Sequence, residues 1–325
     1  MDALLQLEIA VNLFLQHLGS WLAIPFSAIT ALGNEYFYLI AMPAIYWCVD
    51  SALGFRLGVM LVFTNVSNGY FKELFHSPRP FWVDSRVKAL ATETSFGLPS
   101  GHSQNAAALW GTLAGHFKKT WLTIVSIVII FLIGLSRLYL GMHFTRDVIS
   151  GWLIGALLVG LYFWLEKPIA RWIGPKPLSV KILLSFFVSV LFIAGGLLIT
   201  ASAGQWVLPA EWINNSVAAL GVAPDPYDIE GYFTISGVWF GFTAGYAWWQ
   251  NKKGSFKIQG KLGKRLLRFV VGMVGILVLY LGLKLVFPES PQWLGLSLRF
   301  VRYGLIGLWV TALAPWLFEK IHLNV

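Results

Sequence analysis

The sequence has few charged residues and almost no cysteine. Only 12% of its 325 residues are Asp, Glu, Lys or Arg, whereas a soluble domain carries about 25%. The single cysteine, Cys48, excludes an internal disulfide and a thiolate metal cluster. The first residues, MDALLQLEIAVN, have no basic segment ahead of an apolar core, so we predict no cleavable signal peptide. The remainder is 57% hydrophobic, which is typical of a polytopic membrane protein.

Long apolar stretches follow one another along the chain. An apolar helix of about 20 residues crosses a bilayer, and many Trp and Phe residues lie near the ends of the stretches, as in an interfacial aromatic belt. Polar residues such as Glu8 and Asn12 interrupt the first stretch, so residues 5–17 are alternatively an amphipathic helix in the interface. The sequence predicts nine or ten spans. They are expected at 7–31, 34–49, 52–75, 102–117, 119–139, 145–165, 180–201, 231–250, 266–287 and 298–318.

Basic residues gather in three loops that parity places on one side of the membrane. These loops are 117–120, 166–181 and 251–268. The positive-inside rule makes that side cytoplasmic and explains the net charge of +9 without a nucleic-acid partner. The loops at 76–101 and 140–144, and the acidic loop at 202–230, are then extracytoplasmic.

The first polar cluster is KELFHSPRP, residues 72–80. Lys72 ends an expected span, where a lone lysine could simply extend its side chain to water. Arg79 lies between two prolines, and each proline biases the residue before it towards extended geometry. Arg79 is therefore expected on a stiff turn that directs its guanidinium group.

The second polar cluster is GLPSGHS, residues 97–103. Ser100, Gly101 and His102 open an expected helix, whose free amides and positive dipole end can bind an anion. Gly101 allows close approach of the backbone. Alternatively, Ser100 is a plain N-cap of that helix.

The third polar cluster is SRLYLGMHFTRD, residues 136–147, between two uncharged stretches. Arg137 ends one stretch, and Asp147 follows His143 by four residues. If this segment is helical, His143 and Asp147 share a face. A carboxylate bonded to one imidazole nitrogen fixes the tautomer and makes the other nitrogen a better base or nucleophile.

The three clusters are expected to meet on the extracytoplasmic face and to bind a phosphate group there. Three cations and helix-start amides can surround a dianion that has several oxygens. Two histidines suit a two-step transfer, in which one attacks phosphorus and the other protonates the leaving oxygen. No carboxylate cluster suggests Mg²⁺, so we expect no metal and no cofactor.

These segments resemble the signature of the type 2 phosphatidic acid phosphatase superfamily. That signature is K-x6-R-P, then P-S-G-H, then S-R-x5-H-x3-D, and every fixed position is present in order. The resemblance implies that His143 is the nucleophile that forms a phosphohistidine, that Asp147 orients it, and that His102 is the general acid and later the base. It implies a phosphate-binding set of Lys72, Arg79, Ser100, Gly101 and Arg137.

The resemblance also implies an all-α membrane bundle with a six-helix phosphatase core. That core is expected within residues 1–165, followed by three or four further membrane helices within 166–325. Extra C-terminal spans also occur in relatives resembling sphingosine-1-phosphate phosphatases and glucose-6-phosphatases. No motif matches residues 180–325 to either group, and their role stays open.

The expected function is hydrolysis of the terminal phosphate of a lipid phosphate or lipid diphosphate. Substrates that fit are phosphatidate, phosphatidylglycerol phosphate, a long-chain base phosphate and a polyprenyl diphosphate. Residues 85–96 are expected to shape the entrance of the site. The charged residues of this region are candidates for head-group contact or else plain solvated loop residues. They are Asp84, Arg86, Lys88 and Glu93.

Two other functions stay open at this point, and the sequence leaves the oligomeric state undetermined. A phosphotransferase would pass the phosphate from the same phosphohistidine to a lipid or sugar hydroxyl. A non-enzymatic transporter or scaffold would rely on the later spans and the acidic loop at 202–230. Transport is often associated with charges inside the membrane, and the later spans hold few.

Overall fold

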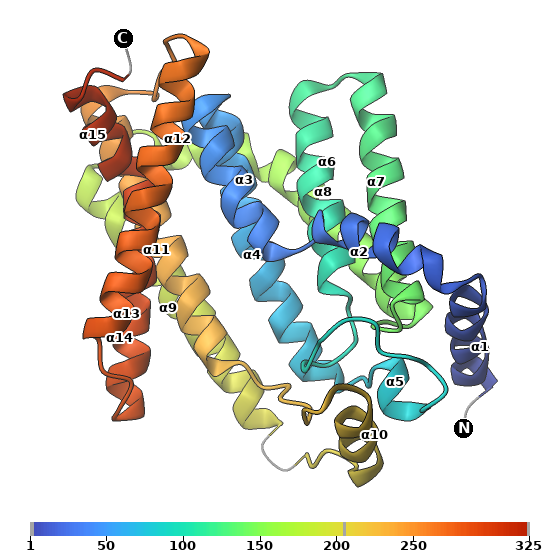
Figure 1. Ribbon diagram of the computed structural model, residues 1–325. Coiled ribbons are helices and arrows are strands. Elements are labelled where there is room, and N and C mark those ends of the chain that lie inside the picture. The colour runs from blue at the N-terminus through green and yellow to red at the C-terminus, as the bar shows by residue number, and fades with distance from the viewer. Residues whose placement is uncertain (1–2, 204–205, 324–325) are drawn as a thin grey trace. The chain divides into compact units, whose positions relative to one another are not determined.

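The computed structural model describes residues 3–203 and 206–323, and these residues contain helices but no β-strand (Figure 1). The expected all-α fold is therefore confirmed. In chain order the α-helices are α1 (Ala3–His17), α2 (Ala23–Ala31), α3 (Glu35–Cys48), α4 (Ser51–Phe75), α5 (Pro80–Val83), α6 (Gly101–Phe117), α7 (Thr120–Tyr139), α8 (Thr145–Ile173), α9 (Leu178–Ser202), α10 (Ala210–Leu220), α11 (Ile229–Lys253), α12 (Leu262–Leu277), α13 (Leu283–Val286), α14 (Gln292–Leu308) and α15 (Ala314–Lys320).

Within residues 3–203 and 206–323, five helical stretches are long and apolar enough to cross a bilayer. They are Thr120–Tyr139, Thr145–Ile173, Leu178–Ser202, Leu262–Val286 and Gln292–Lys320. The last two contain single π-helical turns, at Val278–Gly282 and Trp309–Leu313. The other expected spans after the first coincide with α3, α4, α6 and α11, which lie outside these five stretches. That these four helices also cross the membrane stays a prediction.

The expected first span is broken in two. Helix α1 and the segment Ser20–Ala31 meet at an angle of 90°, and Gly19 adopts a φ of 123° at the break, a value that favours glycine. The polar residues of α1 explain why it is a poor membrane span. The buried Asn12 amide donates to the carbonyls of Leu138 (2.7 Å) and His143 (3.1 Å). Helix α1 therefore supports the third polar cluster.

Contacts divide the chain into two compact units, which are described separately. The first unit consists of Met1–Tyr38, Phe63–Leu161 and Leu198–Asp228. The second unit consists of Leu39–Val62, Tyr162–Leu197 and Ile229–Val325. All three polar clusters belong to the first unit. The expected division into a catalytic part, 1–165, and an additional part, 166–325, concerns function and stays a prediction.

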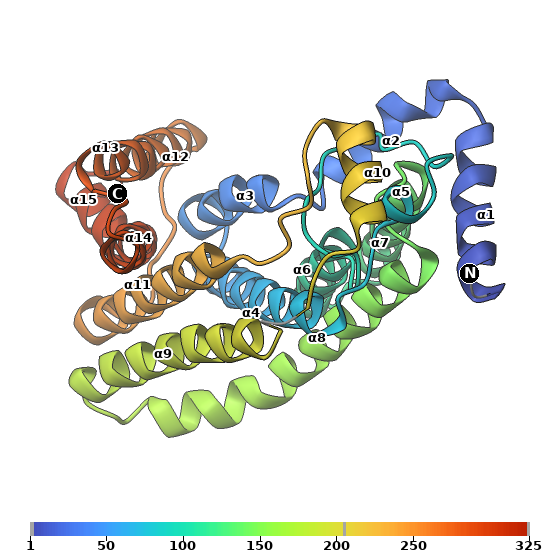
Figure 2. The ribbon, with the colours of Figure 1, turned by 90° about the horizontal axis from the view of Figure 1, so that it is seen from below.

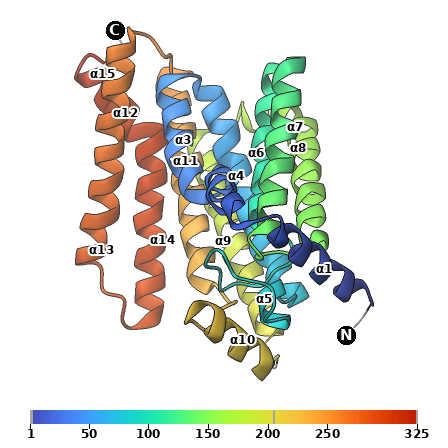
Figure 3. The same cartoon turned by 45° about the vertical axis from the view of Figure 1, so that its right-hand side comes forward.

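In the first unit, α6 and α7 form an antiparallel pair (Figure 3), and α5 lies beside α10 (Figure 2). Residue Ser100 caps α6, because its side chain accepts a hydrogen bond from the amide of Ser103. Helix α10 is a helix that the sequence analysis missed, since residues 202–230 were expected to form a loop. Pro209 precedes it, and Gly221 ends it with a φ of 74°.

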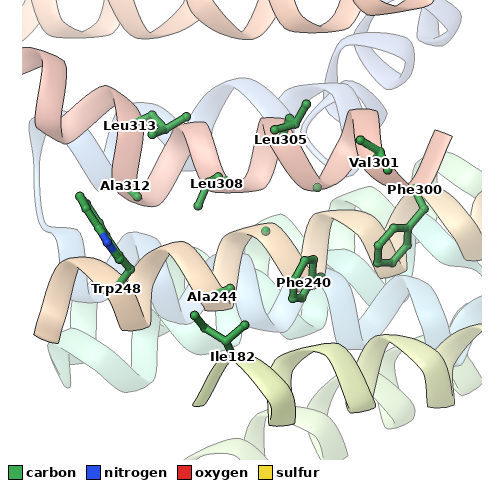
Figure 4. A pocket seen from close by; sticks show the side chains of 12 residues that line it. Ile182, Phe240, Ala244, Trp248, Phe300, Val301, Leu305, Leu308, Ala312 and Leu313 are labelled. Atoms are coloured by element: carbon green, nitrogen blue, oxygen red, sulfur yellow. The ribbon is translucent and has the colours of Figure 1, made fainter. Parts of the chain in front are cut away.

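In the second unit, α11 and α14 lie side by side (Figure 3). Glycines at the contact let the two backbones approach closely, and a Cβ atom built on Gly241 would overlap the carbonyl of Gly304. Beside this contact lies an apolar groove of about 440 Å³ (Figure 4). Phe240, Trp248 and Leu308 are among its lining residues, none of which is titratable.

The α11–α14 contact predicts a large effect of adding one methyl group. We expect Gly241→Ala to lower the thermal stability in detergent, since overpacking costs about 1–3 kcal/mol. The matched control is Gly160→Ala in α8, where an added Cβ meets nothing within 4 Å. A melting temperature equal in the two variants would contradict this packing.

Candidate active site

The three polar clusters meet around a polar pocket of about 370 Å³ in the first unit. The pocket is lined by Gly33, Asn34, Asn65, Asn68, Lys72, Thr92, Glu93, Gly101, His102, Asn105 and His143. Of the predicted site residues, Lys72, Gly101, His102 and His143 therefore share one cavity. Arg79, Arg137 and Asp147 are buried and contact residues of this lining.

Arg79 is fully buried and joins the first cluster to the other segments of the site. Its backbone is extended (φ −92°, ψ 157°), as the flanking prolines predict. Its Nε donates to the Ser95 carbonyl at 2.6 Å, and its Nη1 donates to the Met142 carbonyl at 2.9 Å. Its Nη2 donates to the Phe96 carbonyl at 3.3 Å. These bonds fix the direction of the guanidinium group.

Ser95 orients two cations, a role that the sequence analysis missed. Its Oγ accepts from Lys72 Nζ at 2.7 Å and from Arg79 Nη2 at 3.0 Å. Lys72 therefore does not simply extend from the end of α4 into water. No motif position includes Ser95, and only the fold brings it between the two cations.

His143 and Asp147 lie together, but not for the reason that the sequence suggested. Helix α8 begins at Thr145, so His143 precedes the helix and the expected shared helix face is wrong. Instead, Asp147 Oδ2 accepts from the Phe144 amide at 2.9 Å, across the first turn of α8. This bond places Oδ2 3.5 Å from His143 Nδ1. The other ring nitrogen, Nε2, lies 3.4 Å from Arg79 Nη1.

The surroundings of His143 favour its neutral form. Burial lowers the pKa of His143 well below its usual range, and the positive charges of Arg79, Arg137 and Lys72 lower it further. A neutral imidazole has a free lone pair on one nitrogen and can act as a base or nucleophile.

Ser100 ties the second cluster to the third. Its backbone amide donates to the Asp147 carbonyl at 2.8 Å, and its Oγ accepts from Ser103 Oγ at 3.0 Å. Ser100 is thus the N-cap of α6, the alternative that we gave. Its amide, which we expected to face an anion, is already bonded within the protein. Gly101 and His102, by contrast, line the pocket.

Glu93 contacts the cations of the site and is not the plain solvated loop residue that was one of its two expected roles. Its Oε1 lies 2.8 Å from Arg137 Nη2 and 3.9 Å from His102 Nδ1, and its Oε2 lies 3.4 Å from Arg79 Nη2. Its side chain is 24% exposed, so it is not a solvated loop residue. Burial alone would raise the pKa of Glu93, but Arg79, Arg137 and Lys72 outweigh it and hold the pKa below its ordinary value.

The other charged residues of this loop behave differently. Arg86 is 70% exposed in its side chain and pairs with Asp84 at 2.6 Å. This bond holds the pKa of the Asp84 carboxyl below its ordinary value. The backbone of Lys88 exchanges two hydrogen bonds with the Gln16 side chain of α1. Asp84 and Arg86 therefore pair with each other rather than with the cations of the pocket.

Comparison with known proteins finds matches over the segments that carry the three polar clusters. Residues 53–171 match the model of the PAP2 superfamily, and residues 233–325 match the transmembrane extension of PAP2 superfamily phosphatases. Phosphatidylglycerophosphatase B of Bacillus subtilis is 33% identical over 167 residues, which are 46% of this chain and 78% of that protein. The chain belongs to the PAP2 superfamily, and its apolar helices make it an integral membrane protein.

Two further matches are a mouse protein and a crystal structure. Sphingosine-1-phosphate phosphatase 2 of mouse is 34% identical over 141 residues, which are 41% of this chain and 39% of that protein. The chain thus spans less than half the length of this relative. A crystal structure of a PAP2 type phosphatidylglycerolphosphate phosphatase from Bacillus subtilis is 28% identical, with a TM-score of 0.45. That match covers 53% of this chain and 90% of the other.

The pairing of Glu93 predicts an unusual response to inorganic phosphate. Glu93→Gln leaves Arg79 and Arg137 without their carboxylate, so phosphate no longer competes with it. We expect phosphate to raise the melting temperature of this variant at about a tenfold lower concentration than in the wild type, a difference of about 1.4 kcal/mol. Glu230→Gln is the matched control, because Glu230 forms an exposed ion pair with Arg299. Equal phosphate responses in all three proteins would contradict the prediction.

Proposed function

We propose that the protein is a membrane phosphatase that hydrolyses the terminal phosphate of a lipid phosphate or lipid diphosphate. The observation that carries this proposal is the position of His143, whose ring lies between the Asp147 carboxylate and the Arg79 guanidinium. Lys72 lines the same pocket, and Arg137 is paired with Glu93 of its lining. Two relatives are named for their action on phosphatidylglycerophosphate and sphingosine-1-phosphate, which supports the same substrate class.

In this proposal, the phosphate group replaces the carboxylate of Glu93. Lys72, Arg79 and Arg137 then bind its oxygens, and Arg79 and Arg137 offer the forked donor geometry that suits phosphate. These fixed positive charges stabilise the charge that develops in the transition state. They perform the task that a divalent metal performs in other phosphatases, and so the proposed reaction needs no metal or cofactor.

The first chemical step forms a phosphohistidine. Nε2 of His143 attacks phosphorus while the bond from phosphorus to the leaving oxygen breaks, and His102 gives that oxygen a proton. Nδ1 of His143 carries a proton that faces Asp147. Their separation of 3.5 Å is longer than a hydrogen bond, and it would shorten as the ring gains positive charge.

The second step returns the enzyme to its starting state. His102, now neutral, takes a proton from water, and the resulting hydroxide attacks phosphorus. The bond from phosphorus to Nε2 breaks, and inorganic phosphate leaves. We place this chemistry on the extracytoplasmic face, because the three basic loops are expected on the opposite side of the membrane.

The role of His143 as the nucleophile can be tested by substitution. The detergent-purified protein should release phosphate from at least one member of a panel of lipid monophosphates and a polyprenyl diphosphate, with and without EDTA. His143→Ala should abolish release, since no nucleophile remains, whereas His17→Ala, at an exposed histidine, should leave it unchanged. Release that EDTA abolishes would refute the metal-free mechanism. Release only when a lipid or sugar hydroxyl is added would identify a phosphotransferase.

The role of the Asp147 carboxylate, which lies beside His143, can be tested in the same way. Asp147→Asn keeps the shape of the side chain but removes its charge, so it no longer stabilises the positive ring of His143. We expect kcat to fall about 10²–10⁴-fold with little change in KM. Asp50→Asn is the control, because asparagine also caps a helix well at the start of α4. A kcat for Asp147→Asn within a factor of three of the wild type would argue against this role.

A further inference from the structure

Residues 206–227, which we call the strap, lie between the two ranges that match family models. The strap connects α9 to α11 in sequence and contains α10. It belongs to the first compact unit together with the polar pocket, and its helix lies beside α5 (Figures 1 and 2). Neither motif spacing nor family membership assigns it a role.

Two tryptophans of the strap pack on the first polar cluster and on α5, which follows it. The ring of Trp206 stacks on His76, with centroids 4.7 Å apart and an interplanar angle of 26°. The ring of Trp212 lies 6.1 Å from that of Trp82 in α5. His76 has a φ of 46°, which is uncommon for a residue other than glycine. The stacking therefore covers a turn that directly precedes Arg79.

The strap also contacts the loop that carries Glu93 and Ser95. The rings of Trp206 and Tyr227 meet the ring of Phe96 edge-on, at 5.5 and 5.8 Å. The Asp225 amide donates to the Thr94 carbonyl at 3.1 Å. A second hydrogen bond runs from the side-chain amide of Asn215 to the Trp82 carbonyl at 2.9 Å. The strap is thus hydrogen-bonded both to α5, which follows Arg79, and to the loop that accepts hydrogen bonds from the Arg79 guanidinium group.

The contacted loop has no regular secondary structure of its own. Residues 84–100 form neither helix nor strand, so tertiary contacts determine their conformation. Phe96 is fully buried, and its carbonyl accepts from Arg79. Its neighbour Ser95 orients both Arg79 and Lys72, and Thr94 directly follows Glu93. Each strap contact with this loop therefore falls on a residue that binds a cation of the site or is adjacent to one that does.

We propose that the strap positions the loop 93–96, so that Lys72 and Arg79 face the phosphate group and Glu93 reaches Arg79 and Arg137. Trp206 and Tyr227 act as positioning residues that set the affinity of the site for phosphate without touching it. This inference rests on the proposed function. It gives a role to a segment outside the family signature.

The test compares Trp206→Ala and Trp206→Phe with Trp121→Ala, which removes an exposed tryptophan from α7. KM and kcat for a soluble aryl phosphate, the inhibition constant of vanadate and the melting temperature are measured for each. Trp206→Ala should raise KM and the vanadate constant about tenfold or more. Trp206→Phe should restore most of the affinity because it keeps an aromatic ring, and Trp121→Ala should match the wild type.

A lower melting temperature with an unchanged vanadate constant would overturn the proposal, because the strap would then be a structural cover only. If Trp206→Ala does not fold, Tyr227→Leu is measured in the same way. If the wild type hydrolyses no phosphate ester, the role of the strap is tested instead by the hydrogen-exchange rate of a backbone amide beside the loop. The Gly97 amide donates to the Ser77 carbonyl at 2.8 Å. The hydrogen-exchange rate of this amide should be at least tenfold faster in Trp206→Ala than in Trp121→Ala. Equal rates would refute the proposed role of the strap, whereas the absence of hydrolysis by the wild type would refute only the phosphatase proposal.

Discussion

The burial of Arg79 and Arg137 around one pocket is the constraint on which the site depends. A buried charge is costly unless it is paired and hydrogen-bonded. The protein meets this requirement with backbone carbonyls and with Glu93, which contacts both guanidinium groups. Because a carboxylate can be displaced by another anion, this arrangement supports the proposal that phosphate binds in its place.

Backbone hydrogen bonds connect the polar clusters to one another. The Ser100 amide is bonded to the Asp147 carbonyl, and Arg79 is bonded to the Met142 carbonyl. Asn12 of α1 adds bonds to the carbonyls of Leu138 and His143. The side chains of Asn12 and Arg79 and the backbone amide of Ser100 therefore hold the short segment 138–147 in place. Such support restricts the motion of His143, and in the proposed mechanism a restricted nucleophile loses less entropy on reaction.

The segment between α9 and α11 adds a support that lies outside the family signature. Its aromatic side chains cover Phe96 and His76, and a cluster of rings is a stiff, largely apolar cover. The loop of the proposed phosphate site is therefore held by residues outside the family signature. Helices α9 and α11 flank this segment in the chain.

The sequence by itself determined the membrane class and most helix positions, and its motifs supplied the proposed catalytic set, because apolar length and motif spacing are local properties. It predicted the extended turn at Arg79 from two prolines. It did not reveal Ser95 or the pairing of Glu93 with two arginines, since a loop residue gains such partners only from segments far along the chain. It also missed α10 and misjudged how His143 meets Asp147. Only the tertiary structure decided these points, because helix ends and irregular loops take their conformation from contacts with distant segments rather than from their own residues.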